Sequence, residues 1–163
     1  MTLRLIFVRH GLSSFNQEGR IQGRNDLSIL TKEGQLQAEA AGKTISSIPI
    51  DAIYSSPLQR ASETTKIIID QHQSNLQATY TDELLEVDLG PWSGLTKNEI
   101  KNNFPDELAI WQEKPKELTI NRDDGTKFQP IKELLYQAEN FLKNLFNAHS
   151  GSNKTILIVA HNA

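Results

Sequence analysis

Cysteine is absent from the 163 residues of the chain, so disulfide bonds, thiolate catalysis and cysteine-bound zinc are all excluded. Long apolar runs are also missing. The longest ones, Leu5–Val8 and Ile156–Ala160, are far shorter than the roughly 20 residues of a membrane-spanning helix. The first residues, Met1–Arg4, lack the pattern of a signal peptide. We therefore expect a cytoplasmic protein that has no membrane partner.

Basic charge is not in excess either. The chain has 17 Lys and Arg residues against 20 Asp and Glu residues, which gives a net charge of −3. Because nucleic-acid-binding domains are usually basic, we expect no nucleic-acid partner. A small anionic substrate stays compatible with this charge, since it needs only a local positive pocket. The length and the 37% of hydrophobic residues predict a single domain, residues 1–163.

Short apolar runs predict the strands of a parallel sheet. Leu3–Val8 and Lys154–Ala160 are rich in β-branched and other apolar residues, as expected of strands that are buried on both faces. Asp51–Ser55 is predicted to be another short strand, and Thr79–Leu85 an extended segment.

Helical periodicity and capping residues predict helices between these strands. They run from Thr31 to Ser47, from Pro57 to His72 with Ser56 as the cap, and over Thr96–Asn103, Pro105–Glu113 and Ile131–Phe146. The stretches Gly11–Leu30 and Lys114–Gln129 are polar and are predicted to be irregular. Strands that alternate with helices predict an α/β fold, a three-layer sandwich with a mainly parallel sheet flanked by helices.

Chemically active side chains follow the predicted strands. Arg9 and His10 stand at the end of one strand and His161 at the end of another, while Arg60 lies in the first turn of the helix after Asp51–Ser55. Parallel sheets bind ligands beyond the carboxyl ends of their strands, so we expect these groups to converge there. Singly, each could be a surface charge or a polar strand cap. Two strands that both end in His make a shared site the better interpretation.

These groups suit phosphate chemistry. Arginine binds phosphate bidentately and stays charged, and neutral imidazole is a nucleophile that can carry a phosphoryl group. Gly11 allows the backbone to approach a ligand closely. Zinc hydrolases carry histidines at short local spacings, whereas His10 and His161 are far apart in the sequence. We therefore expect no metal ion and no other cofactor.

Four motifs occur in order along the chain: Arg9-His10-Gly11 with Asn16 and Gln22-Gly23, then Ser55–Ala61 with Thr64-Thr65, then Leu84–Gly94, and finally Ile158–His161. Together they resemble the motifs of the histidine phosphatase superfamily, also called phosphoglycerate mutase-like. The resemblance extends from Leu5 to His161 and implies the fold of that family, which agrees with the three-layer sandwich expected from the pattern.

The resemblance also implies a role for each matching residue. His10 would be the nucleophile, and Glu86 the general acid that protonates the leaving oxygen and then activates water. The remaining residues would surround the phosphate or touch the substrate: Arg9, Arg60, His161 and Asn16 in the first group, and Ser13, Gln22 and Gly23 in the second. The implied activity is metal-independent hydrolysis of a small phosphorylated metabolite through a phosphohistidine at His10.

Glu86 has a weaker physical case of its own. It lies between the apolar residues Leu85 and Val87, so it could be partly buried. Burial would raise its pKa and suit it to donate a proton near neutral pH. Without the resemblance, an exposed acid would be the better interpretation.

A cofactor-dependent phosphoglycerate mutase is the alternative within the family. Such mutases have a Tyr three residues after the acidic Glu and adjacent arginines further along. This chain has Leu89 and Gln112-Glu113 at those places, although Lys97 matches a mutase lysine. The phosphatase is therefore the favoured prediction.

The end of the sequence suggests a second alternative. The chain stops at Ala163, directly after the last predicted strand. Because a parallel strand normally passes into a crossover connection, we expect the domain to be incomplete after His161. A fragment that binds phosphate but turns over little is then possible. The pattern predicts no oligomeric state.

Overall fold

A four-stranded sheet forms the centre of the computed structural model, which describes residues 2–72, 75–122, 124–151 and 153–162. The strand order is β1-β6-β2-β3, and every pairing is parallel. The strands are β1 (Leu3–Arg9), β2 (Ala52–Ser55), β3 (Ala78–Tyr80) and β6 (Lys154–Ala160). The predicted parallel sheet is confirmed.

The inner strand β6 explains the longest apolar run of the sequence. Its residues Ile156–Val159 are 0% exposed, because helices cover both faces of the sheet. β1 pairs with β6 along its full length, from Leu3 opposite Lys154 to Arg9 opposite Ala160. The residues that follow the two strands therefore emerge side by side at one edge of the sheet.

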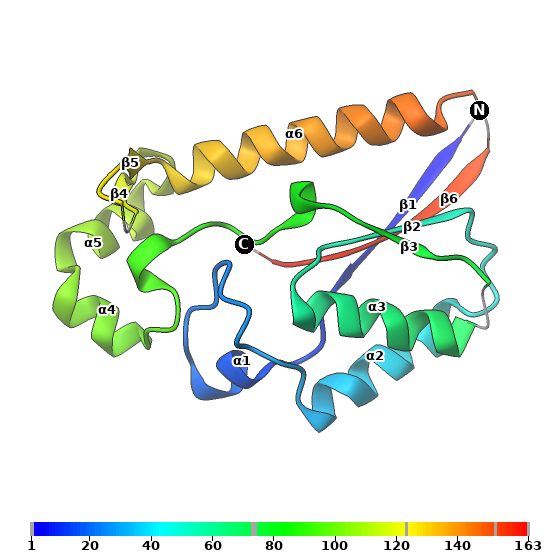
Figure 1. Ribbon diagram of the computed structural model, residues 1–163, viewed down its shortest axis with the longest axis horizontal. Coiled ribbons are helices and arrows are strands. Elements are labelled where there is room, and N and C mark those ends of the chain that lie inside the picture. The colour runs from blue at the N-terminus through cyan, green and yellow to red at the C-terminus, as the bar shows by residue number, and fades with distance from the viewer. Residues whose placement is uncertain (1, 73–74, 123, 152, 163) are drawn as a thin grey trace.

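Helices lie on both faces of the sheet (Figure 1). One face carries α2 (Lys32–Ile45) and α3 (Gln59–His72), and the other carries the long helix α6 (Pro130–His149). Alternate β6 side chains point to the two layers: Leu157 and Val159 pack with Ile45 and Ile68, and Ile156 and Ile158 pack with Phe141 and Leu145. The expected three-layer sandwich is thus confirmed. Within the described residues, no helix is both long and apolar enough to cross a bilayer.

A separate layer of small elements lies at one end of the sheet (Figure 1). We call this part, residues 87–129, the cap. Its core contains Trp92, Ile100, Leu118 and Phe128. Its elements are η2 (Gly90–Trp92), α4 (Lys97–Asn103), α5 (Pro105–Glu113), η3 (Pro115–Glu117), β4 (Ile120–Asn121) and β5 (Lys127–Phe128). The preceding element, η1 (Asp82–Leu84), belongs to the sheet side, where Leu84 packs with Phe141 of α6.

Two stretches expected to be irregular contain short elements. The first holds α1 (Ser14–Glu18), which is capped by Ser13 and ended by Gly19 at φ 68°. A helix of five residues is too short to show an apolar period. The second, predicted as irregular over Lys114–Gln129, contains η3 and the antiparallel pair of β4 and β5.

Two predicted boundaries were wrong. The helix expected from Pro57 begins at Gln59, two residues later. The Ser56 hydroxyl accepts from the Leu58 N–H (3.4 Å) just before this helix and also contacts His161. The extended segment expected over Thr79–Leu85 is shorter. The strand β3 stops at Tyr80, and the chain then turns into η1.

Candidate active site

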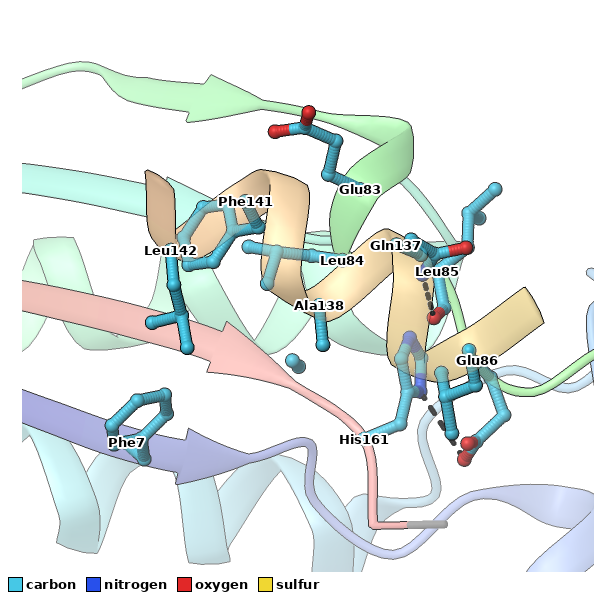
Figure 2. A pocket seen from close by; sticks show the side chains of 12 residues that line it. Phe7, Glu83, Leu84, Leu85, Glu86, Gln137, Ala138, Phe141, Leu142 and His161 are labelled. Carbon is cyan, nitrogen blue, oxygen red and sulfur yellow. Dashed lines mark hydrogen bonds and ion pairs between the residues drawn. The ribbon is translucent and has the colours of Figure 1, made fainter. Parts of the chain in front are cut away.

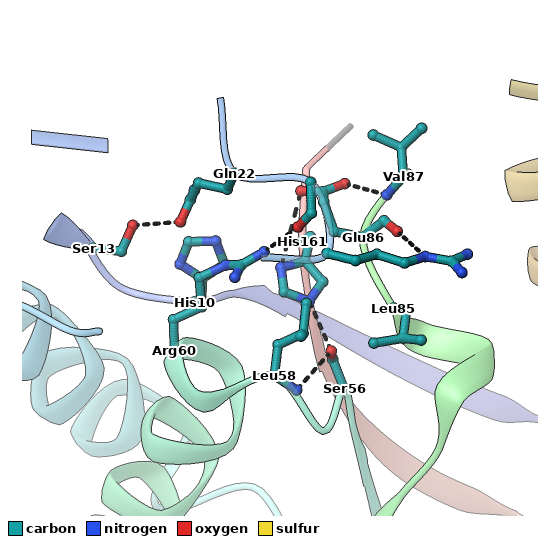
Figure 3. A network of polar contacts seen from close by, with 12 residues as sticks. His10, Ser13, Gln22, Ser56, Leu58, Arg60, Leu85, Glu86, Val87 and His161 are labelled. Atoms are coloured by element: carbon teal, nitrogen blue, oxygen red, sulfur yellow. Dashed lines mark hydrogen bonds and ion pairs between the residues drawn. The ribbon is translucent and has the colours of Figure 1, made fainter. Parts of the chain in front are cut away.

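The two sheet-edge histidines meet. The backbone N–H of His10 donates to the carbonyl oxygen of Ala160 (3.0 Å), which continues the β1–β6 pairing by one residue. The imidazole rings of His10 and His161 then lie with their centroids 5.2 Å apart, tilted by 60°. Two residues separated by nearly the whole sequence therefore share one site (Figure 3).

Gly11 lets the chain turn away from the sheet at this point. A Cβ on Gly11 would lie 2.2 Å from the carbonyl oxygen of Gly34, in the first turn of α2. The Gly11 N–H donates to Thr64 Oγ1 (3.1 Å), and that hydroxyl donates to the Arg60 carbonyl (2.7 Å). The backbone after His10 is therefore fixed against both α2 and α3, which leaves the imidazole little freedom to move.

The tautomer of His10 follows from its hydrogen bond. Its Nδ1 lies 2.7 Å from the Gly11 carbonyl oxygen, which can only accept, so Nδ1 carries the proton and Nε2 keeps its lone pair. Burial lowers the pKa of His10 to about 4, with further lowering by Arg60 and Arg9. His10 is 4% exposed, and its ring is neutral at neutral pH. It has the form that a nucleophile requires.

His161 is neutral for similar reasons. Its Nε2 lies 2.8 Å from Ser56 Oγ, while burial and the nearby Arg60 lower its pKa to about 2. Its Nδ1 lies 3.9 Å from Glu86 Oε2 and has no hydrogen-bond partner within the described part of the chain. Figure 2 shows the His161 ring facing the Glu86 carboxyl group.

The Glu86 carboxyl group is buried beside His161. It is 9% exposed, and its Oε1 accepts from the Val87 N–H (3.0 Å). Burial raises the pKa of Glu86, while the pKa of His161 is lowered. Both changes favour the neutral forms, so this close pair is not a salt bridge when no anion is bound. A buried carboxyl group with a raised pKa is suited to donate a proton.

Arg60 supplies a buried positive charge next to both rings. Arg60 is 0% exposed. Its Nη1 donates to the carbonyl oxygen of Asn25 (3.0 Å), and its Nη2 donates to that of Gly23 (2.8 Å). Burial lowers the pKa of Arg60, whereas Glu86 opposes that shift. Its Nε has no partner among the described residues and is available to a ligand.

Arg9 lines two of the hollows that open at this site. One has a volume of about 300 Å³ and is lined by His10, Gly11 and Asn16 among others. The other, of about 210 Å³, is bordered by Asn16, Gln22, Gly23, Glu86 and Asn162, and by the apolar side chains of Ile21, Val87, Leu89 and Trp111. Polar groups that suit a phosphate therefore adjoin an apolar wall.

Ser13 differs from the other residues expected to touch a substrate, because it lines neither hollow. It is fully buried, and its hydroxyl group donates to Gln22 Oε1 (2.7 Å), which also accepts from the Ser28 hydroxyl (2.9 Å). Ser13 thus lies behind Gln22 and fixes the orientation of its amide.

Arg20 and Trp111 line the 210 Å³ hollow but were not singled out from the sequence. Trp92 packs in the core and is only 2% exposed. Trp111 stacks edge-on against Trp92 (6.1 Å between ring centroids) but also lines the 210 Å³ hollow. No spacing signal marks this second role. In the described residues, no group of three or more His, Asp or Glu side chains could hold a metal ion.

Comparisons with known proteins show which family the chain is similar to. The profile of the Histidine phosphatase superfamily (branch 1) matches residues 5–163. A 2-carboxy-D-arabinitol-1-phosphatase of Triticum aestivum is 38% identical over 98% of this chain and 30% of its own length. Phosphoserine phosphatase 1 of Hydrogenobacter thermophilus is 30% identical over 98% of this chain and 71% of its own length.

A solved structure has the same fold as this chain. Bacillus stearothermophilus YhfR superposes with a TM-score of 0.83 at 30% identity, over 98% of this chain and 74% of its own. The relatives also include proteins named 2,3-bisphosphoglycerate-dependent phosphoglycerate mutase. The chain spans about a third of the length of the plant relatives that it matches.

Proposed function

The chain belongs to the histidine phosphatase superfamily, and on that premise we propose that it hydrolyses small phosphomonoesters, without a metal ion, through a phosphohistidine at His10. The observation that carries this proposal is the pair of neutral, buried imidazoles with Arg60 beside them and the buried Glu86 carboxyl group, whose pKa is raised by burial, within reach. The names of the phosphatase relatives support a small phosphorylated substrate.

In the first step, His10 Nε2 attacks phosphorus and the bond to the leaving oxygen breaks. Arg9, Arg60 and His161 surround the phosphoryl oxygens, and Asn16 completes the pocket. The charge that develops on these oxygens is stabilised by groups that are already in place, which is the main requirement of phosphoryl transfer. An incoming phosphate dianion would also favour the protonated form of His161, whose Nδ1 is free to donate.

Glu86 acts on the leaving group. Its carboxyl proton passes to the departing oxygen, so that an alcohol leaves and a carboxylate remains. In the second step the carboxylate takes a proton from water, the water oxygen attacks phosphorus, and the bond between nitrogen and phosphorus breaks. Inorganic phosphate leaves, and both His10 and Glu86 return to their starting forms.

The leaving group would occupy the 210 Å³ hollow, where Ile21, Leu89 and Trp111 form the apolar wall and Gln22 and Gly23 lie beside the phosphate. In this assignment Ser13 acts through Gln22 rather than on the substrate.

Mutase chemistry has less support in this chain. The matching lysine, Lys97, lines a neighbouring hollow with Lys101 and Gln112 and does not border the 210 Å³ hollow, although the two share an apolar wall. Leu89, at the place of the mutase Tyr, belongs to the buried core of the cap.

The experiment is a turnover assay with p-nitrophenyl phosphate and phenyl phosphate. We expect the wild-type chain to release phosphate from both esters and His10→Ala to release none. His72→Gln is the matched control, because His72 lies at the far end of α3 and contacts the Ile48 carbonyl. Turnover that survives in His10→Ala, or binding of inorganic phosphate without any wild-type turnover, would contradict the proposal. The second result would favour a fragment that only binds phosphate.

A further inference from the structure

Glu86 lies on a segment that has no regular structure. The 3-10 helix η1 ends at Leu84 and η2 begins at Gly90, so neither a helix nor a strand fixes the backbone between them. A general acid must nevertheless stay within hydrogen-bond reach of the leaving oxygen. Other contacts must therefore hold the backbone of Glu86 in place.

Two side chains from distant parts of the sequence hold this backbone. Gln137 Nε2 donates to the carbonyl oxygen of Leu85 (2.8 Å), and Arg24 Nε donates to the carbonyl oxygen of Glu86 (3.2 Å). Arg24 Nη2 also donates to Gln137 Oε1 (2.9 Å), which joins the two. We call this arrangement the Arg24–Gln137 bridge; Figure 2 shows its contact between Gln137 and Leu85.

Both ends of the bridge are anchored. Gln137 belongs to α6, whose Phe141 and Leu145 pack against the sheet. Arg24 lies between two residues whose carbonyl oxygens accept from Arg60, namely Gly23 and Asn25. The bridge therefore connects the acid to the sheet on one side and to the phosphate-binding guanidinium on the other.

Glutamine is chemically suited to its place in the bridge. Its amide accepts from Arg24 through the oxygen and donates to the Leu85 carbonyl through the nitrogen. Methionine has similar length but can do neither, and lysine in place of arginine lacks the planar fork that reaches two acceptors at once. Neither Arg24 nor Gln137 has a role among the site residues assigned above.

We propose that Arg24 and Gln137 are positioning residues that hold Glu86 where it can protonate the leaving oxygen. They act through the backbone of the acid and touch neither the phosphoryl group nor its nucleophile. This inference rests on the proposed function, since it concerns the acid of that reaction.

The test compares two esters of similar shape that differ in their need for an acid. Nitrophenolate leaves without a proton, whereas phenolate is a poorer leaving group and benefits from one. For Gln137→Met we expect kcat/KM with phenyl phosphate to fall about tenfold, as part of the 10²–10⁴-fold effect of a general acid. We expect kcat/KM with p-nitrophenyl phosphate to change less than about threefold, and inhibition by inorganic phosphate to stay the same; kcat/KM is compared because kcat also includes the second step, which uses Glu86 with both esters. Arg24→Lys should likewise lose more activity with phenyl phosphate than with p-nitrophenyl phosphate. Glu86→Gln should show a larger difference between the two esters.

Asn144→Leu provides the matched control. Asn144 also lies on α6, and its side chain donates to Glu83 Oε1 (2.8 Å), so the variant loses a contact between α6 and η1 without touching the Glu86 backbone. It should keep wild-type kinetics with both esters. If Gln137→Met lost kcat/KM equally with both esters, or lost none, this inference would be overturned while the proposed function would stand. If the wild-type chain hydrolysed neither ester, the proposed function would fail and the inference with it.

Discussion

Acid should destabilise the folded protein through its two active-site histidines. The ordinary histidine pKa of 6.5 falls to about 4 for His10 and about 2 for His161, chiefly because both rings are buried. Below the ordinary value the unfolded chain binds protons at these positions, and the folded chain does not. The free energy of unfolding therefore decreases as the pH is lowered from about 6.5 towards the folded pKa values.

The size of the effect follows from the number of protons. One pKa unit corresponds to about 1.4 kcal/mol. Between about pH 6 and pH 5, the unfolded chain binds most of one proton per histidine, so each of the two rings lowers the stability by about 1 kcal/mol. Glu86 has the opposite sign: its folded pKa is raised, so its ionisation costs stability as pH rises above its ordinary value. A comparison of variants removes this contribution.

The variant to compare is His161→Gln, because glutamine can keep a hydrogen bond to Ser56. Urea unfolding at several values between about pH 6 and pH 5 gives the stability of each protein. We expect the wild type to lose about 1 kcal/mol more than His161→Gln over that range, whatever the two stabilities are at neutral pH. Saturating inorganic phosphate should reduce the wild-type loss, since the anion favours protonated His161. Parallel pH dependences for the two proteins would refute the claim that a buried neutral imidazole lies at this position.

Three further predictions concern the site. Gly11→Ala places a Cβ 2.2 Å from the Gly34 carbonyl oxygen, so it should cost about 2 kcal/mol or more of stability and lower kcat; wild-type urea midpoint and kcat would contradict the packing described. Trp111→Leu should raise KM for phenyl phosphate several-fold and leave inhibition by inorganic phosphate unchanged, because Trp111 lines the hollow proposed for the leaving group and not the hollow lined by His10 and Gly11; an unchanged KM would remove it from that wall. Dialysis against EDTA should leave kcat unchanged, and a loss that zinc or magnesium restores would overturn the metal-independent mechanism.

The sheet and its main helices could be predicted from the sequence because burial on two faces leaves a strong pattern. The apolar run that became β6 and the helical period within α6 are examples. The elements that were missed are short. The helix α1 has five residues and is set by the caps Ser13 and Gly19, and β4 and β5 have two residues each. Segments of this length form no periodic face that a sequence pattern could show.

The site also contains residues that could be predicted from the sequence and residues that could not. His10, His161 and Arg60 could be located because each follows a strand or begins the helix after one, and parallel strands bring such positions together. Trp111, Arg24 and Gln137 could not. Trp111 reaches the site from the cap, and Arg24 and Gln137 are 113 residues apart and bind mainly backbone carbonyls. Every residue has a carbonyl oxygen, so no spacing between side chains reveals such contacts.

The central claim is that the phosphoryl group passes through His10 Nε2. Phosphohistidine survives alkaline conditions, so the protein can be quenched in base during turnover of p-nitrophenyl phosphate, digested, and mapped by mass spectrometry and phosphorus NMR. Because Nδ1 is held by the Gly11 carbonyl, we predict one phosphoryl group per chain on the Nε2 atom of His10. We predict none on the histidines outside the site, His72 and His149. A phosphoryl group on His161, on a serine or threonine, or on the Nδ1 atom of His10 would contradict the account.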